Sequence, residues 1–309
     1  SRCNYRRLIV KKNISLYVAI LATGSTLFAA MMGASVKFLS SDLHPLVICF
    51  YRCLLGLILI LPFVAKNNFQ ALKSNNIKLQ FGRSMINVIS MICWFSAIGI
   101  MHFEKATALG FTTPLFTTVL AVFFLGEIIR FHRTAALALG FIGIIVIVRP
   151  GYVPFEFGTV LMLVASLSFS FVLIFVKKLS AVDSSLTIIF YHLLFMTPVF
   201  FVLSLFYWQP VNLHQLGIFA LMGVAGLLSH WCITQSLKLS DTTFVMPLQF
   251  TKLIWASMIG LLLFAEQPDF WTWMGGIIIF ISVIYITYRE AFKKKGTAEP
   301  VQVDRAIIN

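Results

Sequence analysis

Apolar stretches long enough to cross a lipid bilayer recur along almost the whole chain. A membrane-spanning helix needs about 20 apolar residues, and ten stretches meet this length, separated by short polar or basic gaps. Because the stretches are continuously apolar instead of alternating, they predict helices and not barrel strands. The predicted spans lie at roughly 15–36, 45–65, 84–103, 106–126, 134–149, 157–176, 185–207, 215–236, 243–265 and 270–288.

The composition argues against a soluble protein and against a nucleic-acid-binding module. Of the 309 residues, 59% are hydrophobic and only 11% are charged, whereas a soluble domain carries about 25% charged residues. The formal net charge is +13, but the basic residues lie in the gaps and tails, so no nucleic acid is expected as a partner. We therefore expect an all-α integral membrane protein surrounded by the lipid bilayer.

The positions of Lys and Arg orient the predicted spans. Nineteen of the 24 lie in the two tails and in connections on the same side of the membrane, counting Arg83 in the connection after the second span. Three lie on the opposite side. Since Lys and Arg are enriched in cytoplasmic segments, both termini are predicted to be cytoplasmic. Successive connections lie on alternate sides of the membrane, and an odd number of spans would not keep the basic connections and both tails on one side. The asymmetry therefore also favours ten spans.

The second half of the chain echoes the first at an offset near 140 residues. FYR at 50–52 returns as FYH at 190–192, and FFLGE at 123–127 returns as LLFAE at 262–266. Because each half holds five spans, an odd number, the second copy enters from the opposite face, as in transporters built from inverted repeats. The predicted units are a tail at 1–14, a first five-helix repeat at 15–151, a second five-helix repeat at 152–290 and a tail at 291–309.

Cations inside apolar runs are the first candidates for a substrate site. Arg52 and Lys252 lie away from the ends of their spans, where a charge costs at least about 2.5 kcal/mol. Each is either a structural cation bonded to helix carbonyls or a cation that lines a central cavity. Gln249 lies three residues before Lys252, on the same helical face. A cavity with these buried charges should favour a ligand that bears a carboxylate or phosphate.

Histidines and tyrosines near these positions form a second set of candidates. His192 takes the place of Arg52 in the repeat, and His230 lies within the eighth span. Each histidine either bonds to a neighbouring helix or acts as a site group that titrates near neutral pH. Tyr51 and Tyr191 neighbour Arg52 and His192 and can add hydrogen bonds from their phenol groups.

Two tryptophans occupy matching positions in the two halves. Trp94 lies ten residues before Glu104, and Trp231 lies ten residues before Asp241. They fit an interfacial belt or a pair of aromatic walls around a planar or cationic ligand.

The sequence carries no recognisable motif for catalysis or for a cofactor. We find no P-loop, HExxH, nucleophile elbow or dinucleotide fingerprint, so no enzyme activity, cofactor or metal is expected. None of the eleven acids falls in the middle of a span. Coupled carriers commonly use a buried carboxylate, so this favours a facilitator or an exchanger. A lipid-modifying membrane enzyme is the alternative from another class, and its nearest candidate cluster, His102 with Glu104 and Lys105, is interpreted as a solvated loop.

The stretch LGFTTPLFTTVLAVFFLGE at 109–127, followed by GFIGIIVIVRPG at 140–151, resembles the EamA branch of the drug/metabolite transporter superfamily. The resemblance covers nearly the whole chain and implies ten helices in two repeats with both ends cytoplasmic. Within the branch it is nearest to S-adenosylmethionine uptake carriers, through PLFTTVLAVFFLGEII at 114–129 and FIGIIVIV at 141–148. In the ninth span the resemblance implies an arginine and a glutamate, where this chain has Gln249 and Lys252.

The residues and the resemblance predict a multi-pass carrier of the bacterial inner membrane, present as a monomer or homodimer. It is expected to move a small polar metabolite by alternating access. S-adenosylmethionine is the leading candidate, because its carboxylate suits a basic group while its sulfonium and adenine suit aromatic faces. An amino-acid or other metabolite exporter of the same family is the alternative.

Overall fold

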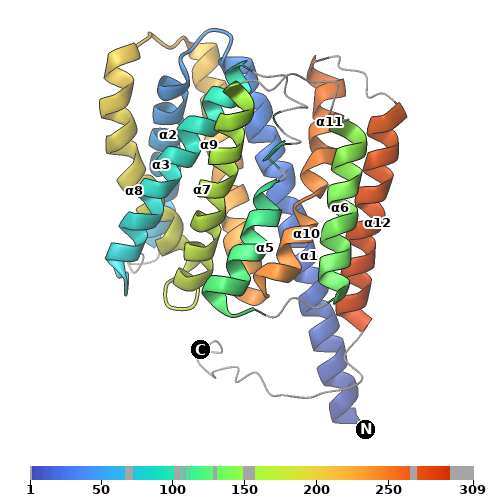
Figure 1. Ribbon diagram of the computed structural model, residues 1–309. Coiled ribbons are helices and arrows are strands. Elements are labelled where there is room, and N and C mark those ends of the chain that lie inside the picture. Colours follow the sequence, from blue (N-terminus) through green and yellow to red (C-terminus); the bar gives the residue numbers. More distant parts are fainter. Residues whose placement is uncertain are drawn as a thin grey trace.

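The computed structural model describes residues 2–66, 72–100, 106, 109–110, 112–127, 131–148, 157–264 and 270–292. Within these ranges the regular elements are all helices (Figure 1). They are α1 (Arg2–Leu39), α2 (Pro45–Lys66), α3 (Ile77–Ile100), α5 (Thr112–Leu125), α6 (Phe131–Val148), α7 (Phe157–Leu179), α8 (Ser185–Ser204), η2 (Leu205–Tyr207), α9 (Leu213–Leu239), α10 (Thr242–Leu248), α11 (Thr251–Phe264) and α12 (Phe270–Phe292).

Seven helices in the described part of the chain are long and apolar enough to cross a membrane. They comprise α1 from Ile14 onward, α2, α3, α7, α8 with η2, α9, and α10 with most of α11. Two shorter apolar helices lie at Thr112–Leu125 and Thr134–Gly143. The predicted all-helical membrane protein is confirmed, and the number of spans stays a prediction. His102, Glu104, Lys105 and Glu266 lie outside the described residues.

Arg83 differs from its expected position. The structure places it inside α3, which begins at Ile77, and not in the connection before the third predicted span. Its side chain is fully buried, and its Nη1 donates a hydrogen bond to the carbonyl oxygen of Ile188 at 3.1 Å. The expected position of Arg83 in the connection is therefore wrong, because α3 begins earlier and a carbonyl of the neighbouring helix α8 accepts a hydrogen bond from the buried guanidinium.

The ninth predicted span is not one continuous helix. It is divided into α10 and α11, and the division falls at Gln249 and Phe250. Pro247 lies just before it, and proline supplies no backbone N–H and clashes with the preceding turn. The backbone tightens here, so that the N–H of Gln249 bonds the carbonyl of Met246 and the N–H of Lys252 bonds the carbonyl of Gln249. Transporters commonly use such interrupted helices near a substrate site.

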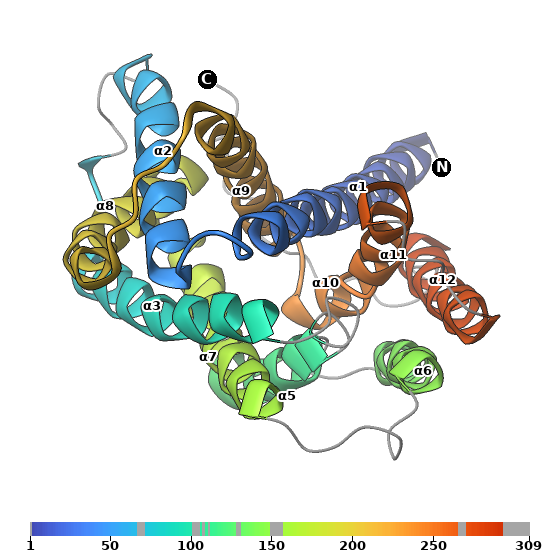
Figure 2. The same ribbon diagram turned by 90° about the horizontal axis from the view of Figure 1, so that it is seen from above.

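Helices from the two halves of the chain pack against each other throughout the bundle. The most extensive pairs are α3 with α7, α1 with α9, α6 with α12, and α2 with α8. Figure 2 shows the α6–α12 pair at one end of the bundle and α2 with α8 at the other, with α1, α3, α7 and α9 between them. The interior of the bundle is therefore built from both halves.

The connection between α1 and α2 folds in the same way as the connection between α7 and α8. Ser40 Oγ donates to the carbonyl oxygen of Lys37 at 2.9 Å, and Ser180 Oγ donates to that of Lys177 at 2.8 Å. Residues 41–44 and residues 181–184, which follow these serines, form the same succession of turns and bends, 140 residues apart.

Asp183 in the second of these connections is buried and anchors the start of α3. Its carboxylate accepts hydrogen bonds from Ser74 Oγ at 2.6 Å, from the backbone N–H of Asn75 at 2.9 Å and from Gln80 Nε2 at 2.9 Å. Asp183→Ala is expected to lower the free energy of unfolding by about 2 kcal/mol, because it removes charge-assisted bonds and leaves the buried amide of Gln80 without this acceptor. Thermal unfolding in detergent measures this loss.

Asp42 in the first connection is the matched control. It is exposed, and its Oδ2 lies 3.4 Å from Gln215 Nε2 at the start of α9. Asp42→Ala should lower the unfolding midpoint much less than Asp183→Ala. Equal shifts for the two variants would contradict the anchoring role of Asp183.

Candidate functional site

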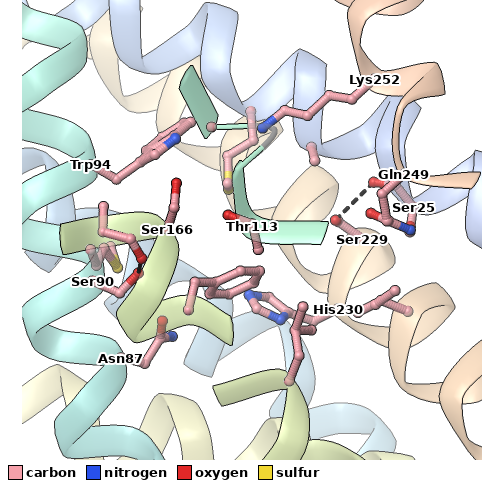
Figure 3. Close-up of a pocket in the computed structure, with 18 of the residues that line it drawn as sticks. Ser25, Asn87, Ser90, Trp94, Thr113, Ser166, Ser229, His230, Gln249 and Lys252 are labelled. Atoms are coloured by element: carbon pink, nitrogen blue, oxygen red, sulfur yellow. Dashed lines mark hydrogen bonds between the residues drawn. The ribbon is translucent and has the colours of Figure 1, made fainter. Parts of the chain in front are cut away.

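A cavity of about 170 Å³ lies among helices of both halves of the chain (Figure 3). Its lining comes from α1, α2, α3, α5, α7, α9, α10 and α11, together with Gly110. Apolar atoms make up most of the wall by area, although half of the lining residues are polar. The polar lining residues are Ser25, Arg52, Asn87, Ser90, Trp94, Thr113, Ser166, Ser229, His230, Gln249 and Lys252.

Arg52 on α2 brings a guanidinium to the cavity wall, with only 4% of the residue exposed. Its Nη2 lies 3.0 Å from His230 Nε2, its Nε lies 3.3 Å from the sulfur of Met32, and its Nη1 lies 3.5 Å from the sulfur of Met91. Thioethers are weak acceptors. The guanidinium therefore rests on neutral groups, and its charge is available to an anionic ligand.

Gly226 of α9 lies beside the guanidinium. A Cβ added to Gly226 would lie 3.4 Å from Arg52 Nη2 and 3.6 Å from the sulfur of Met32. A methyl group at this position would therefore make ordinary van der Waals contact with the guanidinium.

Lys252 and Trp94 lie on the opposite side of the cavity from His230 and Asn87 (Figure 3). Lys252 Nζ is 5.3 Å from the centroid of the Trp94 ring, a cation–π arrangement. Gln249, at the interruption between α10 and α11, directs Nε2 to Ser25 Oγ at 3.2 Å. The interruption thus brings an amide and an ammonium group into the cavity within one turn of chain.

His192 and His230 lie together behind Arg52. The two rings are 4.9 Å apart between centroids, and His192 is fully buried. Asn87 Nδ2, which lies on the cavity wall, is 3.4 Å from His192 Nε2 and 3.5 Å from its Nδ1. His230 lines the cavity, whereas His192 touches it only through these neighbours.

Three other candidates lie away from the cavity lining. Trp231 is 38% exposed, although its neighbour His230 faces inward. Tyr51 stacks on Phe219 with ring centroids 5.1 Å apart. Tyr191 donates its hydroxyl to the carbonyl oxygen of Leu72 at 2.8 Å. The structure thus gathers Arg52, Trp94, Gln249, Lys252 and His230 around one space, with His192 behind it.

No carboxylate lines the cavity among the described residues. Glu127, which follows α5, accepts hydrogen bonds from the backbone N–H groups of Thr242 and Thr243, each at 2.9 Å, and so caps the start of α10. Within the same ranges, no group of three or more His, Cys, Asp or Glu side chains could hold a metal ion. The described cavity wall combines two cations, an imidazole, the side-chain amides of Asn87 and Gln249, and several hydroxyls.

Sequence reasoning did not identify the small polar residues of the lining. Ser25, Asn87, Ser90 and Ser229 lie inside apolar helices, where serine commonly bonds a backbone carbonyl and gives no sign of a cavity. Asn87 was the one detectable residue, since an amide in the middle of a span needs a partner in its surroundings.

The family model of the EamA-like transporter family matches residues 16–149 and matches again at residues 156–288. The chain belongs to this family. EamA-like proteins are named as transporters and not as enzymes, and the family predicted from the two sequence stretches is confirmed. The protein is therefore a membrane transporter.

Several similar proteins match most of the chain. An S-adenosylmethionine uptake transporter of Rickettsia bellii is 28% identical over 84% of this chain and 90% of its own length. A riboflavin transporter of Vibrio cholerae is 29% identical over 85% and 88%. A pseudopaline exporter of Pseudomonas aeruginosa is 25% identical over 87% and 95%. These relatives move different solutes.

A solved crystal structure has a fold similar to that of this chain. It superposes on this chain with a TM-score of 0.68 over 90% of this chain and 96% of the other, at 14% sequence identity. A likeness at this identity concerns the fold alone.

Proposed function

We propose that the protein carries a small polar metabolite with at least one anionic group, and that this solute binds in the central cavity. The observation that carries the proposal is the buried guanidinium of Arg52, whose hydrogen-bonding contacts are an imidazole and sulfur atoms. A buried charge without a counter-ion is costly. A ligand carboxylate would supply two acceptor oxygens in the geometry that guanidinium favours.

The proposed framework is ten spans in two inverted repeats, at 15–151 and 152–290. Under this symmetry α1 corresponds to α7, α2 to α8, α3 to α9, α5 to α10 with α11, and α6 to α12. The symmetry would then carry the observed pair α1–α9 onto the observed pair α7–α3. It would carry the pair α2–α8 and the pair α6–α12 each onto itself. Arg52 and His192 are each the eighth residue of their helices. The two family matches and the duplicated connections support the same symmetry.

Alternating access follows from such a framework. Two related units that meet around one site can rock so that the site opens to either side, without any bond-making chemistry. The cavity draws its lining from both proposed repeats, as this mechanism requires. The solute would contact Arg52 and His230 on one side and Trp94, Gln249 and Lys252 on the other, with His192 supporting His230.

The proposed setting is the bacterial inner membrane with both termini in the cytoplasm. The bias of Lys and Arg supports this orientation. Removing the buried Arg83 from the count leaves eighteen basic residues on the side of the tails against three on the other, so the expected orientation is unchanged.

S-adenosylmethionine is the proposed solute, because a relative named for its uptake matches most of the chain and because its groups suit the cavity. Its carboxylate would bind Arg52, and its adenine or sulfonium would lie near Trp94. The alternative is an amino-acid or other metabolite exporter, which the similarity to a pseudopaline exporter favours.

Uptake into proteoliposomes tests this proposal. Labelled S-adenosylmethionine should enter vesicles that contain the protein and should be chased out by unlabelled S-adenosylmethionine, whereas protein-free vesicles stay empty. Decarboxylated S-adenosylmethionine should compete about tenfold less well or worse, because it lacks the group that would bond the guanidinium. Equal competition by the two compounds would refute the carboxylate contact, and absence of uptake would refute the substrate.

A further inference from the structure

Arg52, His230 and His192 form a continuous polar array that runs from the cavity wall into the bundle. Arg52 Nη2 and His230 Nε2 are 3.0 Å apart, and the His230 and His192 rings follow at 4.9 Å between centroids. Asn87 flanks His192 at 3.4 Å. Beyond it, the buried Arg83 is held by the carbonyl oxygen of Ile188, one turn before His192 on α8. Imidazoles are the side chains that exchange protons near neutral pH.

The contact with Arg52 fixes the protonation state of His230. A guanidinium has five donors and no acceptor, and it does not lose its proton in proteins. His230 Nε2 must therefore accept the hydrogen bond from Arg52 Nη2 through its lone pair. An imidazole that accepts at Nε2 carries its single proton on Nδ1 and is neutral.

The described charged side chains around His230 are cations. Arg52 on α2 and the imidazole of His192 on α8 are its neighbours, Arg83 on α3 bonds the backbone of α8 one turn before His192, and Lys252 on α11 lies across the cavity. Helix α10 carries no charged residue. The described charged side chains of the remaining partners of α9, which are α1 and α7, lie in the last turns of these helices: Lys37, Lys177 and Lys178.

We infer that His230 takes up one proton when a solute carboxylate binds to Arg52, so that the carrier moves its anionic group together with a proton. This inference rests on the proposed function. The hydrogen bond from Arg52 to His230 Nε2 breaks, the guanidinium donates to the carboxylate, and a proton from the buffer joins the freed lone pair of Nε2. The negative charge that the carboxylate brings to Arg52 is offset by the proton that joins His230, and the ammonium and sulfonium charges of S-adenosylmethionine do not change in this step. His230 thereby performs the task that coupled carriers commonly assign to a buried carboxylate.

Proton uptake on binding can be counted by titration calorimetry. The purified protein is titrated with S-adenosylmethionine in two buffers of different ionisation heat, at about pH 6, below the range in which an α-amino group titrates. The binding heat should differ between the buffers by an amount that corresponds to about one proton taken up. Since binding takes up a proton, affinity should rise as pH falls, by at most about tenfold per pH unit.

His230→Gln is the decisive variant. Its amide oxygen can still accept a hydrogen bond from Arg52, but the amide is not protonated near neutral pH. The variant should bind S-adenosylmethionine with a heat that is the same in both buffers and with an affinity that no longer depends on pH. His214→Gln, an exposed change at the start of α9, is the matched control and should behave like the unchanged protein.

The outcomes separate the two proposals. Binding by the unchanged protein with equal heat in both buffers would overturn the proton link and leave the substrate site standing. Proton uptake that persists in His230→Gln would also overturn it, because another group would then be the acceptor. No binding of S-adenosylmethionine by the unchanged protein would overturn the proposed substrate, and the inference built on it would fall as well.

Discussion

Arg52→Gln is expected to weaken the binding of S-adenosylmethionine by about 100-fold, the loss that follows from removing one or two charge-assisted hydrogen bonds. Arg52 is 4% exposed, and its guanidinium contacts an imidazole and two thioether sulfurs, so the ligand carboxylate would be its strongest partner. Decarboxylated S-adenosylmethionine, which lacks this group, should bind the variant and the unchanged protein with similar affinity. Comparing the two ligands on the two proteins isolates the interaction between guanidinium and carboxylate.

Two further variants test whether the loss of affinity comes from the guanidinium geometry and from this position. Arg52→Lys keeps the charge but loses the planar fork of donors, so it should recover only part of the affinity. Lys37→Gln removes a cation from the last turn of α1, away from the cavity lining, and should leave binding unchanged. If Arg52→Gln weakened both ligands equally, the guanidinium would be a structural group that shapes the cavity and not the carboxylate site.

The charged residues of this site could be predicted from the sequence because ionisable side chains are rare inside apolar membrane-spanning stretches. Arg52 and Lys252 interrupt apolar runs, and an ionisable side chain there needs a polar partner or a cavity. Gln249 followed from its spacing to Lys252. The sequence could not show that Pro247 interrupts the helix at this point, since prolines also occur in unbroken membrane helices.

Internal repetition was a weaker guide to the environment of single residues. Trp94 and Trp231 occupy matching positions in the chain, yet Trp94 lines the cavity while Trp231 is 38% exposed. Adjacent residues of a helix point in directions about 100° apart, so small helix rotations between the two halves move a side chain from the interior to the surface. His192, matched to Arg52, shows the same effect, because it meets the cavity only through Asn87 and His230.

Gly140→Ala is expected to lower the free energy of unfolding by about 3 kcal/mol, the upper part of the range for overpacked interiors. A Cβ on Gly140 of α6 would lie 2.1 Å from Cδ2, 2.2 Å from Cε2 and 2.9 Å from Cγ of Phe250. Phe250 is fully buried at the interruption between α10 and α11. We therefore expect that a shift of its ring displaces the backbone that carries Gln249 and Lys252. The variant should therefore lose substrate affinity as well as stability.

Thermal unfolding in detergent, followed by binding of S-adenosylmethionine, measures both losses. Gly217→Ala on α9, where an added Cβ meets nothing within 4 Å, is the matched control and should be neutral or slightly stabilising. Adding Phe250→Leu to Gly140→Ala should restore part of the stability, because the smaller side chain makes room for the methyl group, and the two changes should therefore not be additive. Unchanged stability of Gly140→Ala would mean that the Phe250 ring does not rest on α6, and the interruption that positions Gln249 and Lys252 would then need a different support.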